Sequence, residues 1–138
     1  MSVRRARPGE YETLSRLQSF LAEPAPDLLA AADVVGTVFV STAHRNRPVG
    51  YLLAVASDDG CHVAELVVHP EYRRTGRARD LLEALFDERP AESAVTVTVA
   101  AGNDAARSLY ESVGFEESDC RPGYFDNDDA VVYRRTVE

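Results

Sequence analysis

A basic, glycine-bearing turn joins an apolar strand to an amphipathic helix within residues 65–79. The apolar run 66–68 is typical of a buried strand, and leucines after Gly76 recur at helical spacing. Such a turn presents free backbone N–H groups at the positive end of a helix dipole, where anions bind. The stretch therefore predicts a phosphate or pyrophosphate site at a strand–helix junction. Four arginines add positive charge to it: Arg73, Arg74, Arg77 and Arg79.

The chain of 138 residues is long enough for one domain with a full core, so we expect a single domain over residues 1–138. No apolar run approaches the roughly 20 residues of a membrane span, and the N-terminus lacks the apolar segment of a signal peptide. We therefore expect a cytoplasmic protein that does not bind membranes. Whether it is a monomer or a homodimer stays open.

The cysteine and histidine positions argue against a metal site. Cys61 and Cys120 lack the companions that a zinc site needs, and without an export signal we expect free thiols. We interpret His44, His62 and His69 as surface or strand residues rather than ligands.

The net charge of −8 argues against a nucleic-acid surface, which would require a basic stripe. All 15 basic residues are arginine, and no lysine is present. One explanation is a salt-loving host, where screening relieves self-repulsion between acidic groups. The other is a GC-rich genome that favours arginine codons.

Hydrophobic periodicity predicts the order β-α-α-β-β-β-α-β-α-β-β, and thus an α+β domain with a mixed sheet and helices on both faces. We expect residues 121–129 to form a polar connection between the last two strands. The expected strands are residues 2–6, 34–42, 49–57, 61–69, 95–99, 115–120 and 131–137. The expected helices are residues 8–22, 28–32, 78–88 and 104–113.

Two motifs resemble those of the GCN5-related N-acetyltransferases (GNAT). The family's acetyl-CoA loop, Gln/Arg-x-x-Gly-x-Gly/Ala, is matched by Arg73-Arg74-Thr75-Gly76-Arg77-Ala78 after the strand pattern Leu66-Val67-Val68-His69-Pro70. The family's Asn-x-x-Ala-x-x-Leu-Tyr-x-x-x-Gly-Phe is matched by Asn103, Ala106, Leu109, Tyr110, Gly114 and Phe115. The resemblance covers residues 62–115 and implies a GNAT-type sheet of six to seven strands.

The resemblance also implies acetyl-CoA as co-substrate. Its pantetheine arm would pair with Leu66, Val67 and Val68, and its pyrophosphate would bind the N–H groups of Arg73, Arg74, Thr75, Gly76, Arg77 and Ala78. Independently of the family, a glycine lets backbone approach an anion, and arginines add charge-assisted hydrogen bonds. Further coenzyme contacts are implied for Asn103, Arg107 and Tyr110. The alternative for the arginine cluster is a solvated basic face.

In the family, an acceptor amine attacks the thioester carbonyl directly and coenzyme A leaves as a thiolate. Tyr110 matches the tyrosine that often protonates the leaving sulfur, and a phenol can donate such a proton or hydrogen bond. The alternative is that Tyr110 is the polar tip of an apolar helix face.

A candidate for the base lies next to the coenzyme strand. Glu65 precedes the coenzyme strand, where several family members carry an acidic residue near the amine, and it could act through water. The alternatives are an edge carboxylate that faces solvent, or water acting alone.

The tail from Arg121 to Val132 resembles the ribosomal-protein N-terminal acetyltransferase branch of the family. In that branch, aromatic residues of an Asn-Tyr-Tyr segment enclose the acceptor's N-terminal residue; here the segment is Gly123-Tyr124-Phe125. A glutamate base of the branch is replaced by Thr98, which cannot act as a base at neutral pH. The acceptor is thus a protein N-terminus or a small-molecule amine, and a non-catalytic acyl-CoA-binding module is a further alternative.

Overall fold

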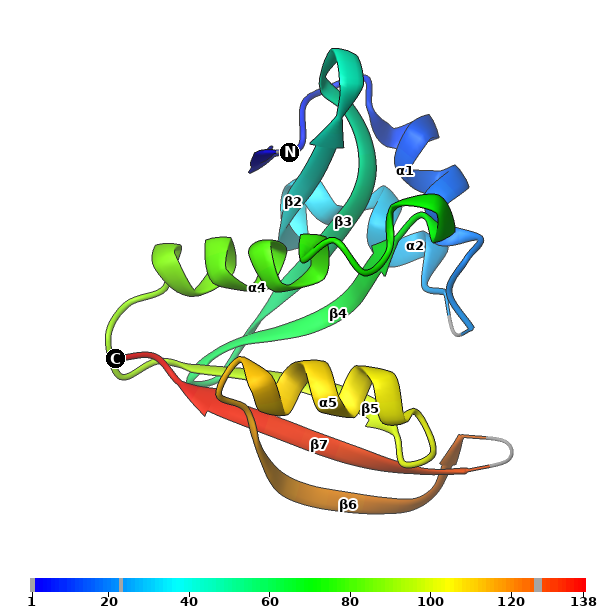
Figure 1. Ribbon diagram of the computed structural model, residues 1–138. Coiled ribbons are helices and arrows are strands. Elements are labelled where there is room, and N and C mark those ends of the chain that lie inside the picture. The colour runs from blue at the N-terminus through cyan, green and yellow to red at the C-terminus, as the bar shows by residue number, and fades with distance from the viewer. Residues whose placement is uncertain (1, 23, 126–127) are drawn as a thin grey trace.

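A single seven-stranded mixed sheet organises the chain, with strand order β1-β2-β3-β4-β5-β7-β6 (Figure 1). The computed structural model describes residues 2–22, 24–125 and 128–138. The strands are β1 (Ser2–Arg5), β2 (Gly36–Ala43), β3 (Arg47–Ser57), β4 (Gly60–Val68), β5 (Ala94–Ala100), β6 (Glu116–Phe125) and β7 (Asp128–Thr136). Among the strand pairs of the described residues, β4–β5 alone is parallel, because the helix between them carries the chain back across the sheet. The predicted α+β class, mixed sheet and strand number are confirmed.

Helices cover both faces of the sheet, as predicted. On one face, α4 (Arg77–Glu88) and α5 (Asp104–Ser112) pack on the larger core, where Leu82, Tyr110 and Tyr133 meet. On the other face, α1 (Tyr11–Gln18), α2 (Pro26–Ala30) and α3 (Ala32–Val35) cover a smaller core around Tyr51 and Leu53 (Figure 1). In the described part of the chain, no helix combines the length and apolarity needed to cross a bilayer.

A β-bulge in β4 shapes the centre of the sheet. The β3–β4 register shifts so that Leu53 pairs with Glu65 and Ala54 pairs with Val63, which leaves Ala64 as an extra residue. The bulge inverts the alternation of side chains. Val63 packs in the larger core, whereas Val67 packs in the smaller core under α1 and α2. Glu65, two residues before Val67, is thereby directed to the side of α1.

β4 and β5 separate beyond this bulge. Their parallel ladder joins Gly60–Val63 to Ala94–Val97 and then stops, although both strands continue. Each keeps its outer neighbour: β3 pairs with Leu66–Val68, and β7 pairs with Thr98–Ala100. The two strands therefore diverge in a V, as Figure 1 shows. We call the place where they diverge the V-shaped opening; among the described residues, the edge of each arm that faces the other has no strand partner.

Several predicted boundaries are wrong at the N-terminal helices. The helix expected over residues 8–22 is only Tyr11–Gln18, because Gly9 adopts a left-handed turn (φ +89°) and the Glu10 carboxylate accepts the Arg7 N–H and binds Arg4. Residues 34 and 35, expected in a strand, end α3 instead.

The expected polar connection over residues 121–129 is also wrong, apart from residues 126 and 127, which lie outside the described residues. β6 continues to Phe125 and β7 begins at Asp128, so the segment is the end of a hairpin. β6 is an edge strand with almost every residue exposed, so it lacks the apolar alternation by which strands are detected. An edge strand also tolerates Pro122, and Gly123 (φ +66°) lies at a register shift.

Candidate active site

A cavity of about 760 Å³ opens where β4 and β5 separate. It brings together residues that are far apart in the sequence, from the coenzyme strand, the α5 motif and the C-terminal hairpin. Its predicted members are Glu65, Leu66, Asn103 and Tyr110, and it also contains Leu21, Ala22, His62, Val63, Ala64, Val97, Thr98, Val99, Ala100, Ala106, Tyr124, Phe125 and Asp128.

The predicted coenzyme strand forms one arm of the V-shaped opening. Leu66 lies in the cavity wall and is half-buried, whereas Val67 and Val68 are buried. Beyond Val63 the edge of β4 that faces β5 has no strand partner, so it can accept an extended chain as an added strand. The Val68 carbonyl oxygen already accepts a hydrogen bond from Arg73 Nε at 2.9 Å.

The predicted anion loop has the required backbone conformation. Arg74 (φ +65°) and Gly76 (φ +81°) both adopt the left-handed region, and Gly76 directly precedes α4. A side-chain carbon added at Gly76 would meet no atom within 4 Å, so its glycine is needed for conformation and not for space. Among the described residues, none accepts a hydrogen bond from the N–H groups of residues 76–79. They are therefore available to an anion at the N-terminus of α4.

The side chains of this loop have varied roles. Arg77 donates to Ser41 Oγ and to the Thr42 carbonyl, both at 3.0 Å, and its guanidinium lies over the Tyr72 ring. Thr75 Oγ1 donates to the Tyr72 carbonyl at 2.7 Å. Arg74 is exposed, and Ala78 is half-buried in the first turn of α4. The guanidinium of Arg77, like that of Arg73, thus fixes the loop to neighbouring strands.

The helix α5 and its N-cap contribute Asn103 and Tyr110 to the cavity wall. The Asn103 side chain accepts the Ala106 N–H at 3.2 Å, which confirms the predicted N-cap. Tyr110 is only 7% exposed and packs edge-on against Phe115, with ring centroids 5.7 Å apart. Burial raises the pKa of Tyr110 to about 12. Its phenol is therefore neutral at physiological pH and retains a proton that it can donate in a hydrogen bond.

Arg107, predicted to bind the coenzyme, is committed to contacts within the protein. Its guanidinium donates to Tyr133 Oη at 3.0 Å and to the Ala101 carbonyl at 2.9 Å, and it pairs with Glu117. Three of its N–H groups thus join α5 to β6, to β7 and to the turn that follows β5. The sequence motif gave no sign of this role because its partners lie elsewhere in the chain.

Glu65 is not the solvent-facing edge carboxylate considered above, since it is only 4% exposed. Oε1 accepts bonds from Gln18 Nε2 at 3.1 Å and from the Tyr51 hydroxyl at 2.9 Å. Oε2 accepts bonds from Gln18 Nε2 at 3.1 Å and from the Ala25 N–H at 2.8 Å. Burial, together with the nearby Glu65 charge, raises the pKa of Tyr51, so its phenol stays a donor. Glu65 therefore ties α1 and the segment before α2 to the sheet.

His62 is a cavity residue that sequence reasoning did not connect with the site. It is half-buried, and its Nδ1 lies 2.8 Å from Thr96 Oγ1 on β5. Burial lowers the pKa of His62, and the positive charge of Arg121 lowers it further. No local motif marks this residue, because its partners come from other strands.

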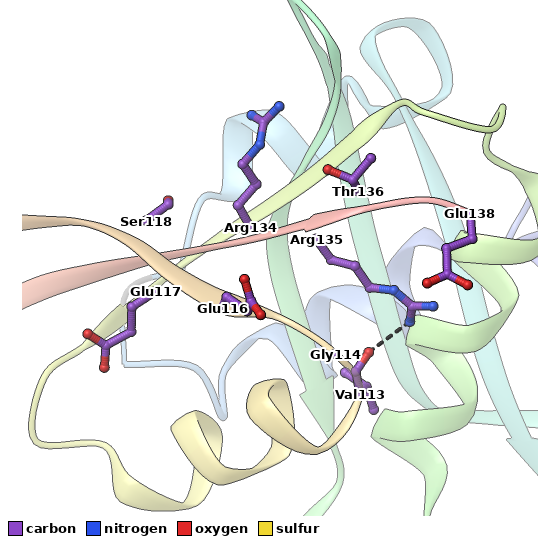
Figure 2. Close-up of a pocket in the computed structure, with 9 residues that line it drawn as sticks. All are labelled: Val113, Gly114, Glu116, Glu117, Ser118, Arg134, Arg135, Thr136 and Glu138. Carbon is purple, nitrogen blue, oxygen red and sulfur yellow. Dashed lines mark hydrogen bonds between the residues drawn. The ribbon is translucent and has the colours of Figure 1, made fainter.

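A second hollow, of about 430 Å³, lies at the opposite end of β7 and contains none of the predicted site residues (Figure 2). Its wall carries charged side chains such as Glu116, Arg134 and Arg135. Figure 2 shows Arg135 directed at the Val113 carbonyl, to which it donates at 2.7 Å. Arg135 also stacks on Phe86, so it fastens the end of α5 to the sheet. Among the described residues, no three His, Cys, Asp or Glu side chains gather to hold a metal ion, and Cys61 and Cys120 are free thiols.

A family model described as an acetyltransferase (GNAT) domain matches residues 18–136. The chain belongs to the GNAT acetyltransferase family. The predicted family, and with it the predicted class of acetyltransferase domain, is confirmed. The matched range includes the anion loop, the V-shaped opening and Tyr110.

This GNAT domain is 38% identical over 93 residues to the [ribosomal protein bS18]-alanine N-acetyltransferase of Salmonella typhimurium. The alignment covers 63% of each chain, and alignments with the Escherichia coli enzyme of the same name cover about half of that enzyme (49%). The crystal structure of the ribosomal-protein-S18-alanine N-acetyltransferase from Escherichia coli superposes with a TM-score of 0.88 at 24% identity, over 99% of this chain and 94% of the other. The acetyl-CoA complex of Arabidopsis thaliana NAA60 superposes with a TM-score of 0.85 at 16% identity, over 99% and 98% of the two chains.

Proposed function

We propose that this GNAT domain is an acetyl-CoA-dependent N-acetyltransferase whose acceptor is the N-terminal amine of a protein. The observation that carries the proposal is the end of β4–β5 pairing at Val63 and Val97, which opens a cavity with Tyr110 in its wall. A free strand edge, unpaired loop N–H groups and a neutral phenol together suit a thioester of an anionic coenzyme.

In this proposal the coenzyme is bound mainly by backbone. Residues 66–68 hold the pantetheine arm, and the N–H groups of residues 73–78 bind the pyrophosphate at the N-terminus of α4. Arg74 adds charge from the surface, while Arg73 and Arg77 keep the loop in shape.

Tyr110 stabilises the leaving group. With its pKa raised to about 12, its phenol is a weaker acid than an ordinary thiol, whose pKa is near 8.5. Full transfer of the phenolic proton to the thiolate is therefore uphill. The expected contribution is a hydrogen bond to the sulfur that strengthens as negative charge develops.

The acceptor side of the cavity supports a peptide amine. Tyr124 and Phe125 lie in its wall with their rings edge-on, 5.0 Å apart, at the end of β6. Asp128 supplies a carboxylate in the same wall, which favours a cationic acceptor. Because two relatives are named [ribosomal protein bS18]-alanine N-acetyltransferase, a peptide with an N-terminal alanine is the first acceptor to test. A small-molecule amine remains the second acceptor class.

The test is release of free thiol from acetyl-CoA in the presence of peptides with different N-terminal residues and of small amines, including polyamines. Turnover with peptides that is lost when their N-terminus is blocked supports the proposal. Turnover with small amines but not with peptides would instead identify a small-molecule amine acetyltransferase. Coenzyme binding without turnover on any acceptor would identify a binding module instead.

We also propose that the acidic, lysine-free composition suits a high-salt environment. A net charge of −8 in 138 residues produces repulsion between acidic side chains. In molar salt the Debye length is about 3 Å, so this repulsion is largely screened.

A further inference from the structure

The cavity lacks a free carboxylate at the positions where a base was expected. Both oxygens of the buried Glu65 carboxylate already accept hydrogen bonds from three donors: Gln18 Nε2, which contacts both oxygens, the Tyr51 hydroxyl and the Ala25 N–H. Thr98, in the same cavity, has no basic lone pair to offer at neutral pH. The proton of an incoming ammonium therefore needs another acceptor.

His62 has the geometry for this role. It lies on β4 directly before Val63, the last β4 residue paired with β5, and it lines the same cavity as Tyr110. Its Nδ1 is occupied by Thr96 Oγ1 at 2.8 Å. Among the described residues its Nε2 has no hydrogen-bond partner and is not sealed inside the protein. If Nδ1 carries the proton and donates to Thr96, the basic lone pair lies on the accessible Nε2.

We propose that His62 is the general base that deprotonates the acceptor amine, directly or through one water. This proposal rests on the acetyltransferase function proposed above. In this proposal Glu65 has a positioning role, since its hydrogen bonds hold the wall of the acceptor side. Tyr110 stabilises the sulfur of the leaving group.

Each proton that leaves the acceptor nitrogen has a defined acceptor. His62 Nε2 takes one proton from the ammonium, and the freed nitrogen lone pair forms the bond to the thioester carbonyl carbon. The tetrahedral intermediate collapses, the C–S bond breaks, and sulfur leaves with the electron pair while Tyr110 donates a hydrogen bond to it. The second nitrogen proton passes to the sulfur, and the imidazolium releases its own proton to solvent.

The surroundings of His62 keep it neutral. Burial and the Arg121 charge on β6 both lower its pKa, so that it is available as a base at neutral pH. Thr96 is the polar neighbour on β5. The other titratable groups of the cavity wall are Glu65, Tyr110, Tyr124 and Asp128. Glu65 is already occupied by its donors, and Asp128 accepts the Gly102 N–H at 2.7 Å.

The test is the pH dependence of kcat at saturating peptide and acetyl-CoA for the wild type and for His62→Gln. We expect kcat to fall by roughly 10²- to 10⁴-fold in the variant, with the acetyl-CoA Kd unchanged. The wild-type acid limb should coincide with the His62 pKa measured by NMR titration. In His62→Gln that limb should move toward the pKa of the bound amine. His44→Gln, at an exposed histidine, is the matched control and should match the wild type.

A second variant tests the role of His62 even if His62→Gln fails to fold. Arg121→Ala removes an exposed positive charge that lowers the His62 pKa, so its acid limb should move to higher pH. An active wild type whose acid limb persists in His62→Gln, or does not move in Arg121→Ala, overturns the role of His62 but leaves the acetyltransferase function intact. A wild type that binds acetyl-CoA and acetylates no acceptor overturns both proposals.

Discussion

The two halves of the cavity are built in different ways. In the proposed function, the coenzyme half begins at Leu66 in the cavity wall and continues beyond the cavity through residues 67–78, where a strand edge and a left-handed loop offer backbone N–H groups. The acceptor half uses side chains from β4, β5, the β6–β7 hairpin and the segment after α1. Recognition by backbone groups is compatible with many different side chains. In the acceptor half, each substitution changes the shape or charge of the cavity wall. The coenzyme can therefore be predicted from the sequence, whereas the acceptor cannot.

The largest expected effect tests whether Glu65 is an anchor for the acceptor half. Glu65→Ala leaves the Tyr51 hydroxyl, the Gln18 amide and the Ala25 N–H buried without an acceptor. We expect unfolding free energy to fall by about 3–5 kcal/mol. Urea denaturation measures it, with the exposed Glu83→Ala as control. Equal stability of the two variants would contradict the anchoring role.

Tyr110→Phe tests chemistry at the boundary between the halves. Removal of the hydroxyl should lower kcat by roughly 100-fold, because the developing thiolate loses its hydrogen bond. The acetyl-CoA Kd should stay within about twofold, since the ring and its packing on Phe115 remain. Steady-state kinetics and calorimetric binding separate the two quantities. An unaltered kcat would remove Tyr110 from the mechanism.

Gly76→Ala tests the backbone half alone. An L-residue at φ +81° costs about 1–2 kcal/mol, so the loop should leave this conformation and misplace its N–H groups. We expect the acetyl-CoA Kd to rise roughly tenfold. Gly9→Ala is the matched control, because Gly9 is also left-handed (φ +89°) with open space around it, yet lies outside the site. A similar Kd in both variants would argue against the loop as the anion site.

Salt should produce a smaller effect with opposite signs in two measurements. Screening weakens the attraction of the loop for the pyrophosphate, so the acetyl-CoA Kd should rise by roughly a factor of three to ten between low and molar KCl. The same screening relieves repulsion across the acidic surface, so Tm should climb. A flat Tm over this range would contradict adaptation to high salt.

The sequence by itself determined the fold class, the loop and the cap of α5, because these depend on local features. Strand and helix periods, a glycine at a left-handed position and an asparagine N-cap each act within a few residues. It predicted the two strands of the β6–β7 hairpin over residues 115–120 and 131–137 but missed their ends over residues 121–125 and 128–130. β6 is exposed on both faces and lacks the alternation that burial imposes.

Only the tertiary structure decided what Glu65, Arg107 and His62 do. The bulge at Ala64 directs Glu65 toward α1, where Gln18, Ala25 and Tyr51 occupy its oxygens. Arg107 is held by groups that the chain supplies before and after it, and His62 meets Thr96 only because β4 and β5 pair at that register. The protonation and availability of a side chain depend on neighbours that are distant in the sequence, and folding alone brings them within hydrogen-bonding distance.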